Sequence, residues 1–352
     1  METRQLGRTG LAPGIIGLGV EHLNGQPRDR VLEVTGHALD RGVSLLDLIA
    51  WTPEVQQCVG EAIAGRREEV ILAGHLGMAE TNGQYRRTRD VAKSRECLEA
   101  QLERLGTEYL DILYCPHNCD DPADLEEMLA PGGVVALGRS LRDSGTARCL
   151  GFSGHSYSLA AQALDATDPD VIMLPVNLAV AMAPEATAVL EQCAGRGVGV
   201  VAMKTYAGGT LFERCPGLSP LDCLGFALAQ PGVAVAAVGC RTTAQVDTAL
   251  AYLELPPGEQ GADRAIQGAQ AAMQGHCTYC RHCEPCPVGI DVAGVHRLLS
   301  AAEQGATDEL RARYLALETD PADCIRCEAC TERCPFGVPA ADDVRRVAEL
   351  LG

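Results

Sequence analysis

The chain has 352 residues, of which 47% are apolar, and its formal net charge is −18. That length and content can bury one large core and a small further domain. The acidic charge argues against nucleic acid as a partner, because no cluster of basic residues would offset the repulsion from phosphates. No basic and apolar leader and no apolar run of roughly 18 residues is found, so we expect a cytoplasmic protein without membrane contact.

The first 255 residues alternate short apolar runs, rich in β-branched residues, with amphipathic stretches of mixed charge. This pattern predicts eight strands, each followed by a helix. The predicted strands are Ile15–Val20, Val43–Ile49, Val70–Leu76, Leu110–His117, Ala147–Gly154, Val171–Asn177, Gly199–Thr205 and Val233–Cys240. Continuous apolar strands covered by helices favour an all-parallel sheet, and eight such units close into a (β/α)8 TIM barrel. The alternative is an open doubly wound sheet, but its glycine fingerprint is incomplete, because His22 stands where a third glycine is needed.

Polar residues follow almost every predicted strand, at the end where active sites of this barrel gather. The alternative for any one of them is a helix cap or a solvated loop residue. Their convergence on one rim nevertheless predicts a site. The rim residues are Glu21, His22, Asp47, His75, His117, Asn118, Asp120, Ser153, His155, Asn177, Lys204 and Arg241.

Two motifs resemble the aldo/keto reductase family, and the resemblance extends over almost the whole barrel. They are the opening run RQLGRTGLAPGIIGLGV, from Arg4 to Val20, and the run VAMKTYAGGT, from Val201 to Thr210. The resemblance implies a nicotinamide-dependent carbonyl reductase with an Asp-Tyr-Lys-His tetrad. Asp47 matches the aspartate, but the tyrosine position falls on Thr52 and the lysine position on His75. His117 matches the histidine, one residue later than the usual spacing.

Half of the tetrad is therefore replaced. A threonine hydroxyl is too weak an acid to donate the proton that the tyrosine donates, whereas a histidine with a pKa near 6.5 could do so beside a carboxylate. We expect Asp47, His75 and His117 to be catalytic. Lys204, one of only two lysines in the chain, is a fourth candidate, and Tyr206 is a spare proton donor. The competing interpretation is that the imidazoles only bind loop carbonyls.

The nicotinamide site is altered too. The family holds the carboxamide with a serine–asparagine pair on strand five and a glutamine on strand six, whereas the matching positions here are Ser153, Gly154 and Met173. Gly239 and Arg241 precede a predicted helix N-terminus, where Arg241 could bind a phosphate. A surface ion pair is the alternative for this arginine. We expect NADP(H) to bind weakly or not at all.

Seventeen cysteines without a secretion signal favour reduced thiols and metal binding over disulfides. Nine are scattered singly through the first 240 residues and predict small buried apolar side chains. The other eight form two compact runs. They are Cys277, Cys280, Cys283, Cys286, Cys324, Cys327, Cys330 and Cys334.

The second run has the C-x2-C-x2-C-x3-C-P spacing of bacterial ferredoxins, so the two runs predict two [4Fe–4S] clusters. By resemblance to two-cluster ferredoxins, the last cysteine of each run crosses over: Cys334 completes the first cluster and Cys286 the second. The first run has two rather than three residues before its last cysteine, which leaves the crossover open. Two zinc sites of four cysteines each are the alternative. The apolar spacing between residues 287 and 323 predicts two helices that pack the module together.

These observations predict a barrel over residues 1–255, a linker and helix over 256–274, and a ferredoxin-like, mainly helical iron–sulfur domain over 275–352. A barrel of this family fused to such a module resembles a known subgroup of aldo/keto reductase-like proteins. The favoured function is an oxidoreductase for a small carbonyl or polyol-type substrate, whose clusters relay electrons from a ferredoxin or another one-electron carrier. A lyase or isomerase with structural clusters is the alternative, and an electron-transfer protein with an inactive barrel is a third, less favoured one.

Overall fold

The chain divides into two compact units. The first consists of Met1–Gly209 and Gly217–Ile266, and the second of Thr210–Pro216 and Gln267–Gly352. The computed structural model describes residues 1–50, 52–81, 84–119, 121–178, 184–209, 211–212, 215, 217–256, 260, 274–277, 283–303, 305–334 and 336–352.

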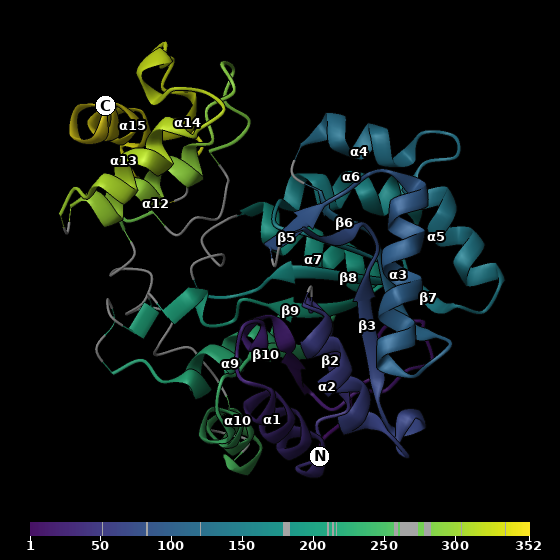
Figure 1. The fold of residues 1–352 in the computed structure, drawn as a ribbon. Helices are drawn as coiled ribbons and strands as arrows, with labels where there is room; N and C mark the ends of the chain where they lie inside the picture. Colours follow the sequence, from purple (N-terminus) through teal and green to yellow (C-terminus); the bar gives the residue numbers. More distant parts are fainter. Residues whose placement is uncertain are drawn as a thin grey trace. The chain divides into compact units, whose positions relative to one another are not determined.

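The first unit contains a closed barrel of eight parallel strands, which confirms the predicted fold of this part of the chain (Figure 1). Its strands follow the order β1-β10-β9-β8-β7-β6-β3-β2 around the barrel. All eight predicted strands are found, with ends shifted by at most two residues. They are β1 (Ile16–Gly19), β2 (Leu45–Asp47), β3 (Ile71–His75), β6 (Leu110–Cys119), β7 (Ala147–Gly154), β8 (Val171–Pro175), β9 (Gly199–Met203) and β10 (Val233–Gly239).

Helices cover the outside of these strands (Figure 1). Ser, Thr or Asp side chains cap several of their N-termini, as at Asp90, Ser156 and Thr242. The helices are α1 (Arg28–Asp40), α2 (Pro53–Ile63), α3 (Val91–Leu105), α4 (Pro122–Leu129), α5 (Val134–Asp143), α6 (Tyr157–Thr167), α7 (Pro184–Arg196), α9 (Pro220–Leu228) and α10 (Thr243–Leu250). Short 3-10 helices lie at η1 (Val20–Leu23), η2 (Arg67–Glu69), η4 (Ala207–Gly209) and η5 (Ala251–Glu254). None of the described helices is long and apolar enough to cross a membrane.

Alternate residues of the strands fill the barrel. Successive side chains of a strand point to opposite faces, so residues two apart share the interior. The buried cluster accordingly contains Leu45 of β2, Ala73 of β3, Ile112 and Tyr114 of β6, and Met173 of β8. A residue two positions beyond the last inward apolar residue of a strand must therefore point into the mouth of the barrel.

A two-stranded antiparallel hairpin after β3 was not among the predicted elements. It consists of β4 (Met78–Thr81) and β5 (Gln84–Arg87). Gly77 and Thr88 close its base, where the amide of Thr88 donates to the carbonyl of Gly77 over 2.9 Å. Gly77 has a φ of +86°, and a Cβ there would lie 2.7 Å from the Thr88 oxygen, so this position requires glycine.

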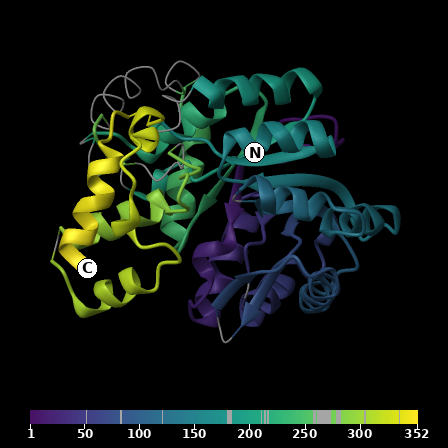
Figure 2. The same ribbon diagram turned by 90° about the horizontal axis from the view of Figure 1, so that it is seen from above.

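The described part of the second unit is formed by helices and turns, shown in yellow-green to yellow in Figure 2. The helices are α12 (Val292–Ala302), α13 (Asp308–Leu315), η6 (Pro321–Asp323), α14 (Ala329–Glu332) and α15 (Ala340–Leu351). Helices α12 and α15 pack together and bury Val295 and Leu299 of one with Val344 and Val347 of the other. The two helices predicted between the cysteine runs are confirmed as α12 and α13. The linker predicted over 256–274 lies mostly outside the described residues.

Candidate active site

Asp47 and His75 are the next inward-facing residues of their strands. Asp47 lies two residues after Leu45 on β2, and His75 two residues after Ala73 on β3, so each follows a core residue. Both residues are buried: 6% of the surface of Asp47 and 3% of that of His75 are exposed to solvent. The strands therefore place a carboxylate and an imidazole in the layer above the apolar core, at the C-terminal ends of β2 and β3.

A β-bulge brings His117 to the same place. Tyr114 points into the core, so strict alternation would make position 116 the next inward residue. The pairing of β6 with β7 shifts there: Tyr114 lies opposite Gly151 and His117 opposite Ser153, so three steps on β6 match two on β7. One extra residue reverses the alternation, and His117 turns inward. The bulge would account for the spacing of His117, one residue later than that expected from the family resemblance.

The three side chains form a continuous hydrogen-bonded chain. Nε2 of His75 lies 2.6 Å from Oδ1 of Asp47, and Nδ1 of His75 lies 2.9 Å from Nδ1 of His117. A carboxylate only accepts, so Nε2 of His75 carries the proton, and Nδ1 of a neutral His75 accepts from Nδ1–H of His117. In this arrangement the unprotonated nitrogen of His117 is Nε2. Asp47 thus fixes the tautomers of both imidazoles.

The environment favours neutral His117. Burial lowers the pKa of His117 well below its usual value, and the neighbouring His75, Arg89, His155 and Arg87 lower it further. This is the opposite of the expected proton donor held in its charged form by a carboxylate. Asp47 touches His75 rather than His117, so its charge does not offset the cost of burying a charged His117. The structure therefore presents His117 as a base near neutral pH.

Thr52 is the residue expected at the tyrosine position of the family. It is the N-cap residue of α2 without a side-chain cap bond, and its hydroxyl donates to Oδ1 of Asn24 over 3.1 Å. Its neighbour Trp51 lies outside the described residues. Tyr114, which sequence reasoning did not select, lies beside His75 with ring centroids 4.8 Å apart. Burial and the charge of Asp47 raise the pKa of Tyr114 well above its usual value, so it is a poor acid at neutral pH.

Lys204 belongs to a different group of hydrogen bonds from that of Asp47, His75 and His117. Its Nζ donates to Nε2 of His155 over 2.7 Å, and its carbonyl accepts from the side chain of Asn177 over 3.0 Å. Its φ of +53° is in the left-handed region, where non-glycine residues are uncommon. Burial raises the pKa of the nearby Tyr206, which makes it a poor spare proton donor. The residues after β7, β8 and β9 therefore form a second polar group around Lys204.

The positions expected to hold a nicotinamide fit it only in part. Ser153 is buried at the end of β7, but Met173 belongs to the apolar core. A Cβ at Gly154 would lie 2.7 Å from the ring of Phe152, so a larger residue cannot take the place of this glycine without a shift.

The phosphate site expected at the end of β10 involves Gly239 and Arg241. A Cβ at Gly239 would lie 2.0 Å from the ring of His22, so this glycine makes room for that imidazole. The backbone amide of Arg241 donates to the side chain of Gln245, at the start of α10. The packing against His22 accounts for Gly239, and the bond of Arg241 involves only its backbone, so binding of a phosphate by its side chain stays a prediction.

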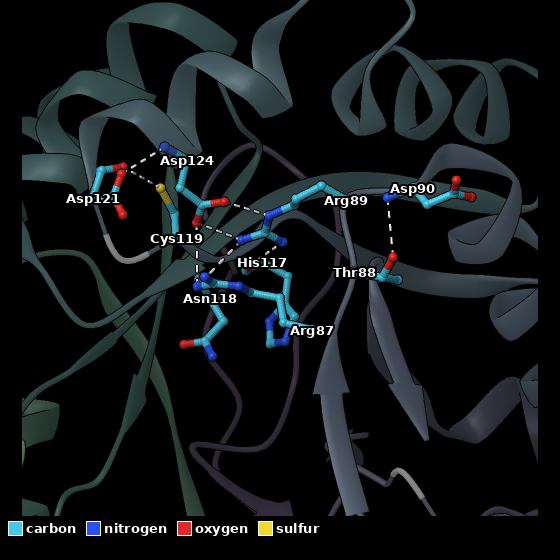
Figure 3. Close-up of polar contacts among 9 residues, drawn as sticks. All are labelled: Arg87, Thr88, Arg89, Asp90, His117, Asn118, Cys119, Asp121 and Asp124. Atoms are coloured by element: carbon cyan, nitrogen blue, oxygen red, sulfur yellow. Dashed lines mark hydrogen bonds and ion pairs between the residues drawn. The ribbon is translucent and has the colours of Figure 1, made fainter. Parts of the chain in front are cut away.

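A polar cluster beside His117 was also not predicted (Figure 3). Arg89 follows the β4–β5 hairpin and makes a bidentate ion pair with Asp124 of α4, at 2.7 Å for both bonds. Its Nη1 donates to the carbonyl of His117 over 3.1 Å. Arg87 donates to the carbonyl of Asn118 over 2.8 Å. No local sequence motif marks these residues, because three separate elements bring them together.

Four of the expected cluster ligands line one hollow in the second unit. Apolar residues such as Ile290, Val292 and Val344 line the same hollow. Its cysteines are Cys286, Cys324, Cys327 and Cys330. They combine three thiols of the second run with the last thiol of the first, which is the combination that a crossover requires. Cys280 lies outside the described residues.

The two cysteine runs are also tied together by Arg333, which donates to the carbonyls of Cys283 and Pro285 over 3.4 and 2.8 Å. Between the cysteines, Arg326 and Glu328 have φ values of +57° and +58°, which turn the backbone sharply. Within the described ranges, no group of three or more His, Cys, Asp or Glu residues is arranged to hold a single metal ion.

Comparisons with known proteins identify the barrel. Residues 15–216 match the model of the aldo/keto reductase family. The chain belongs to this family, whose members are oxidoreductases. Its C-terminal region lies beyond the matched residues, and the family match says nothing about it.

Curated relatives match parts of the chain. An aldo-keto reductase of Bacillus subtilis, YhdN, is 31% identical over 165 residues, which are 44% of this chain and 48% of the relative. The uncharacterized oxidoreductase YqkF of the same species is 26% identical over 236 residues, 66% of this chain and 72% of the relative. L-galactose dehydrogenase of Arabidopsis thaliana is 24% identical over 61% of this chain and 69% of its own. The chain thus spans about half to three quarters of these relatives.

Solved structures agree on the fold. The holo form of aldo-keto reductase AKR11C1 from Bacillus halodurans has a TM-score of 0.63 at 22% identity, covering 76% of this chain and 96% of its own. A putative aldo-keto reductase from Pseudomonas aeruginosa has a TM-score of 0.58 at 25% identity, covering 71% and 95%.

Proposed function

We propose that the barrel is an aldo/keto reductase-type oxidoreductase in which Asp47, His75 and His117 replace the usual tetrad as a proton relay. The observation that carries this proposal is the hydrogen-bonded chain from Asp47 through His75 to His117 at the C-terminal end of the barrel. Its neutral terminal imidazole suits proton removal. The substrate class is a small polyol-type alcohol, oxidised to the carbonyl compound.

The relay removes the hydroxyl proton of the substrate. Nε2 of His117 accepts this proton, and the charged imidazole then donates through Nδ1 to His75, whose other nitrogen faces Asp47. A positioned base of this kind contributes roughly 10²–10⁴-fold to rate. A nicotinamide dinucleotide, when bound, supplies the acceptor for the hydrogen that leaves the carbon as hydride. Two of the relatives, L-galactose dehydrogenase and D-threo-aldose 1-dehydrogenase, carry names that denote sugar oxidation.

The second unit is proposed to hold two [4Fe–4S] clusters. The cysteine spacing supports this, and so does the hollow that gathers Cys286 with Cys324, Cys327 and Cys330. Cys277, Cys280, Cys283 and Cys334 would hold the other cluster. Clusters of this kind pass single electrons, so a ferredoxin or a similar one-electron carrier is the expected partner. On this proposal, 275–352 is a ferredoxin-like domain that follows the barrel.

A non-redox lyase or isomerase is the second candidate. The replacement of the carboxamide contacts by Gly154 and by the buried Met173 favours it, because such an enzyme needs no nicotinamide. The same three relay residues would then move a proton between carbon atoms of the substrate, and the clusters would be structural.

The test uses anaerobically purified protein with a panel of small polyols and their carbonyl products. Reduction of NADP⁺, or of a one-electron dye, is followed with each alcohol. We expect a substrate whose oxidation is lost in His117→Gln and kept in His37→Gln, a matched change at a surface histidine that pairs with Asp247. Substrate rearrangement without any reduced acceptor would support the lyase or isomerase. Full activity of His117→Gln would overturn the relay.

A further inference from the structure

We propose that Arg89 is the positioning residue of this site: with Asp124 it clamps the backbone of His117 and so fixes the last imidazole of the relay. This inference rests on the proposed function, because it concerns the same base. Arg89 lies outside the barrel strands, on the segment that joins the β4–β5 hairpin to α3.

The clamp connects three elements through one guanidinium (Figure 3). Nε and Nη2 of Arg89 bind the two carboxylate oxygens of Asp124, each over 2.7 Å. Nη1 donates to the carbonyl of His117 over 3.1 Å, and Nη2 also donates to that of Asn118 over 3.3 Å. The end of the hairpin, the end of β6 and the first turn of α4 are therefore held in one geometry.

The clamp binds β6 at the point where the pairing of β6 with β7 is irregular. The ladder between β6 and β7 shifts on both sides of His117, and Asn118 has a φ of +50°. A bulged strand end loses regular pairing. The guanidinium binds the two carbonyls of this segment, so it replaces contacts that a regular strand would provide.

The ion pair is sheltered from water, since the side chains of Arg89 and Asp124 are each 9% exposed. Asp124 is held in turn by its place in α4, where its amide donates to Oδ1 of Asp121 over 2.8 Å. Bidentate guanidinium–carboxylate pairs add geometric specificity that an ammonium lacks. Lysine at position 89 would keep the charge but not the fork.

The charge of Arg89 acts on the same imidazole. The groups that face His117 are His75 of β3, Arg87 and Arg89 near the hairpin, and His155 after β7, while Asp47 acts through His75 and Asp124 is paired with Arg89. Arg89 contributes to lowering the pKa of His117. The residue thus has two separable effects, one of geometry and one of charge.

Two substitutions separate these effects. Arg89→Lys keeps the charge and removes the fork, whereas Arg89→Gln removes both. Turnover is measured with the substrate found for the wild type, and the pKa of His117 is measured by NMR of ¹³C-labelled histidine in the full chain. Arg95→Gln, at an exposed ion pair of α3, is the matched control.

We expect kcat to fall on the order of 10²-fold in both variants with little change in KM, because a small misplacement of a base has this effect. The pKa of His117 should stay near its wild-type value in Arg89→Lys and rise in Arg89→Gln. Asp124→Asn keeps the side-chain shape and should lower kcat in the same way; it replaces Arg89→Gln if that variant does not fold.

Wild-type kcat in Arg89→Lys and Asp124→Asn, with kcat lost in His117→Gln, would overturn the positioning role and leave the relay intact. Wild-type activity of His117→Gln would instead overturn the relay itself. A fall in stability alone, with kcat and the pKa of His117 unchanged in the folded fraction, would show that the clamp is merely structural.

Discussion

At the level of single residues, the order of contacts decides which chemistry the site can perform. A carboxylate next to an imidazole favours the charged form, and sequence alone therefore suggested a proton donor. In the structure Asp47 is hydrogen-bonded to His75, and His117 faces His75 and two arginines. The result is a base at the end of a relay. Residue identity was predicted from the sequence, but protonation depends on distances that the sequence does not contain.

The buried neutral His117 should make the stability of the barrel depend on pH. Its pKa is lowered in the folded state, so the unfolded chain binds more protons once the pH falls below about 6.5, the usual histidine value. Acidification through that range should therefore destabilise the protein. In His117→Gln the slope of unfolding free energy against pH should decrease between pH 7.5 and 5.

This slope is measured by urea unfolding at each pH. His296 in the second unit also has a lowered pKa, which burial causes, so the comparison uses the difference between variant and wild type. His37→Gln should keep the wild-type slope. An unchanged slope in His117→Gln would show that this imidazole binds protons equally in the folded and unfolded protein, which contradicts a lowered pKa.

The inner members of the relay should matter less for substrate binding than for turnover. Asp47→Asn can donate to His75 and so permits the wrong tautomer, while leaving the shape of the site unchanged. We expect kcat to fall about 10²–10⁴-fold, the range attributed to a positioned acid or base, with little change in KM. Steady-state kinetics on the identified substrate measures this. A loss confined to KM would place Asp47 in substrate binding instead.

At the level of elements, hydrophobic period was enough to predict all eight barrel strands, because each is a continuous buried run. The β4–β5 hairpin has no such run. The dipeptide Asn82-Gly83 between its strands is the strongest short-range hairpin signal, and it was the available clue. The bulge in β6 and the Arg89–Asp124 pair could not be predicted, since both depend on register and on contacts between distant segments.

Two glycines in outer helices should respond in opposite ways to alanine. Gly36 in α1 has open space around its missing Cβ, so Gly36→Ala should stabilise by about 0.5–1 kcal/mol through helix propensity. Gly60 in α2 has the backbone oxygen of Arg104 at 2.5 Å from that position, so Gly60→Ala should destabilise by about 1–3 kcal/mol. Urea unfolding of both variants tests the packing of α2 on α3, and equal effects would contradict it.

The ends of β7 and β8 set the expected affinity for NADPH. On the family resemblance, Ser153 would retain one of three polar carboxamide contacts, whereas Gly154 and Met173 would remove two. Each lost hydrogen bond costs roughly 0.5–1.5 kcal/mol, so affinity should be about tenfold or more below that of relatives with the full set. Calorimetric titration of NADPH measures it. A dissociation constant in the low-micromolar range or below would mean that other residues compensate.

At the level of the whole molecule, the two units pose different problems of stability. The barrel buries a large core of its own, whereas the described residues of the second unit include few buried apolar side chains beyond α12, α15 and the neighbouring turns. Small modules of this kind usually need metal or disulfides. The described cysteines of the second unit form no disulfide bond. Metal binding and folding should therefore be coupled there.

The distribution of cysteines between the two proposed clusters yields the sharpest test of the second unit. Anaerobically purified protein should contain about eight iron and eight sulfide per chain, following two cubanes. The hollow lined by Cys286, Cys324, Cys327 and Cys330 predicts that Cys286 and Cys327 serve one cluster, although they belong to different runs. Cys286→Ser and Cys327→Ser should therefore alter the same signal in the reduced-state EPR spectrum, and Cys334→Ser the other.

Cys97→Ser, at a cysteine outside both runs, should leave the iron content and the spectrum unchanged. If each run instead held its own cluster, Cys286→Ser would alter the same signal as Cys283→Ser, and Cys334→Ser would alter the same signal as Cys327→Ser. That outcome would contradict the crossover but not the clusters. Stoichiometric zinc with no visible absorbance would contradict the clusters themselves, because eight thiolates could equally form two tetrahedral zinc sites.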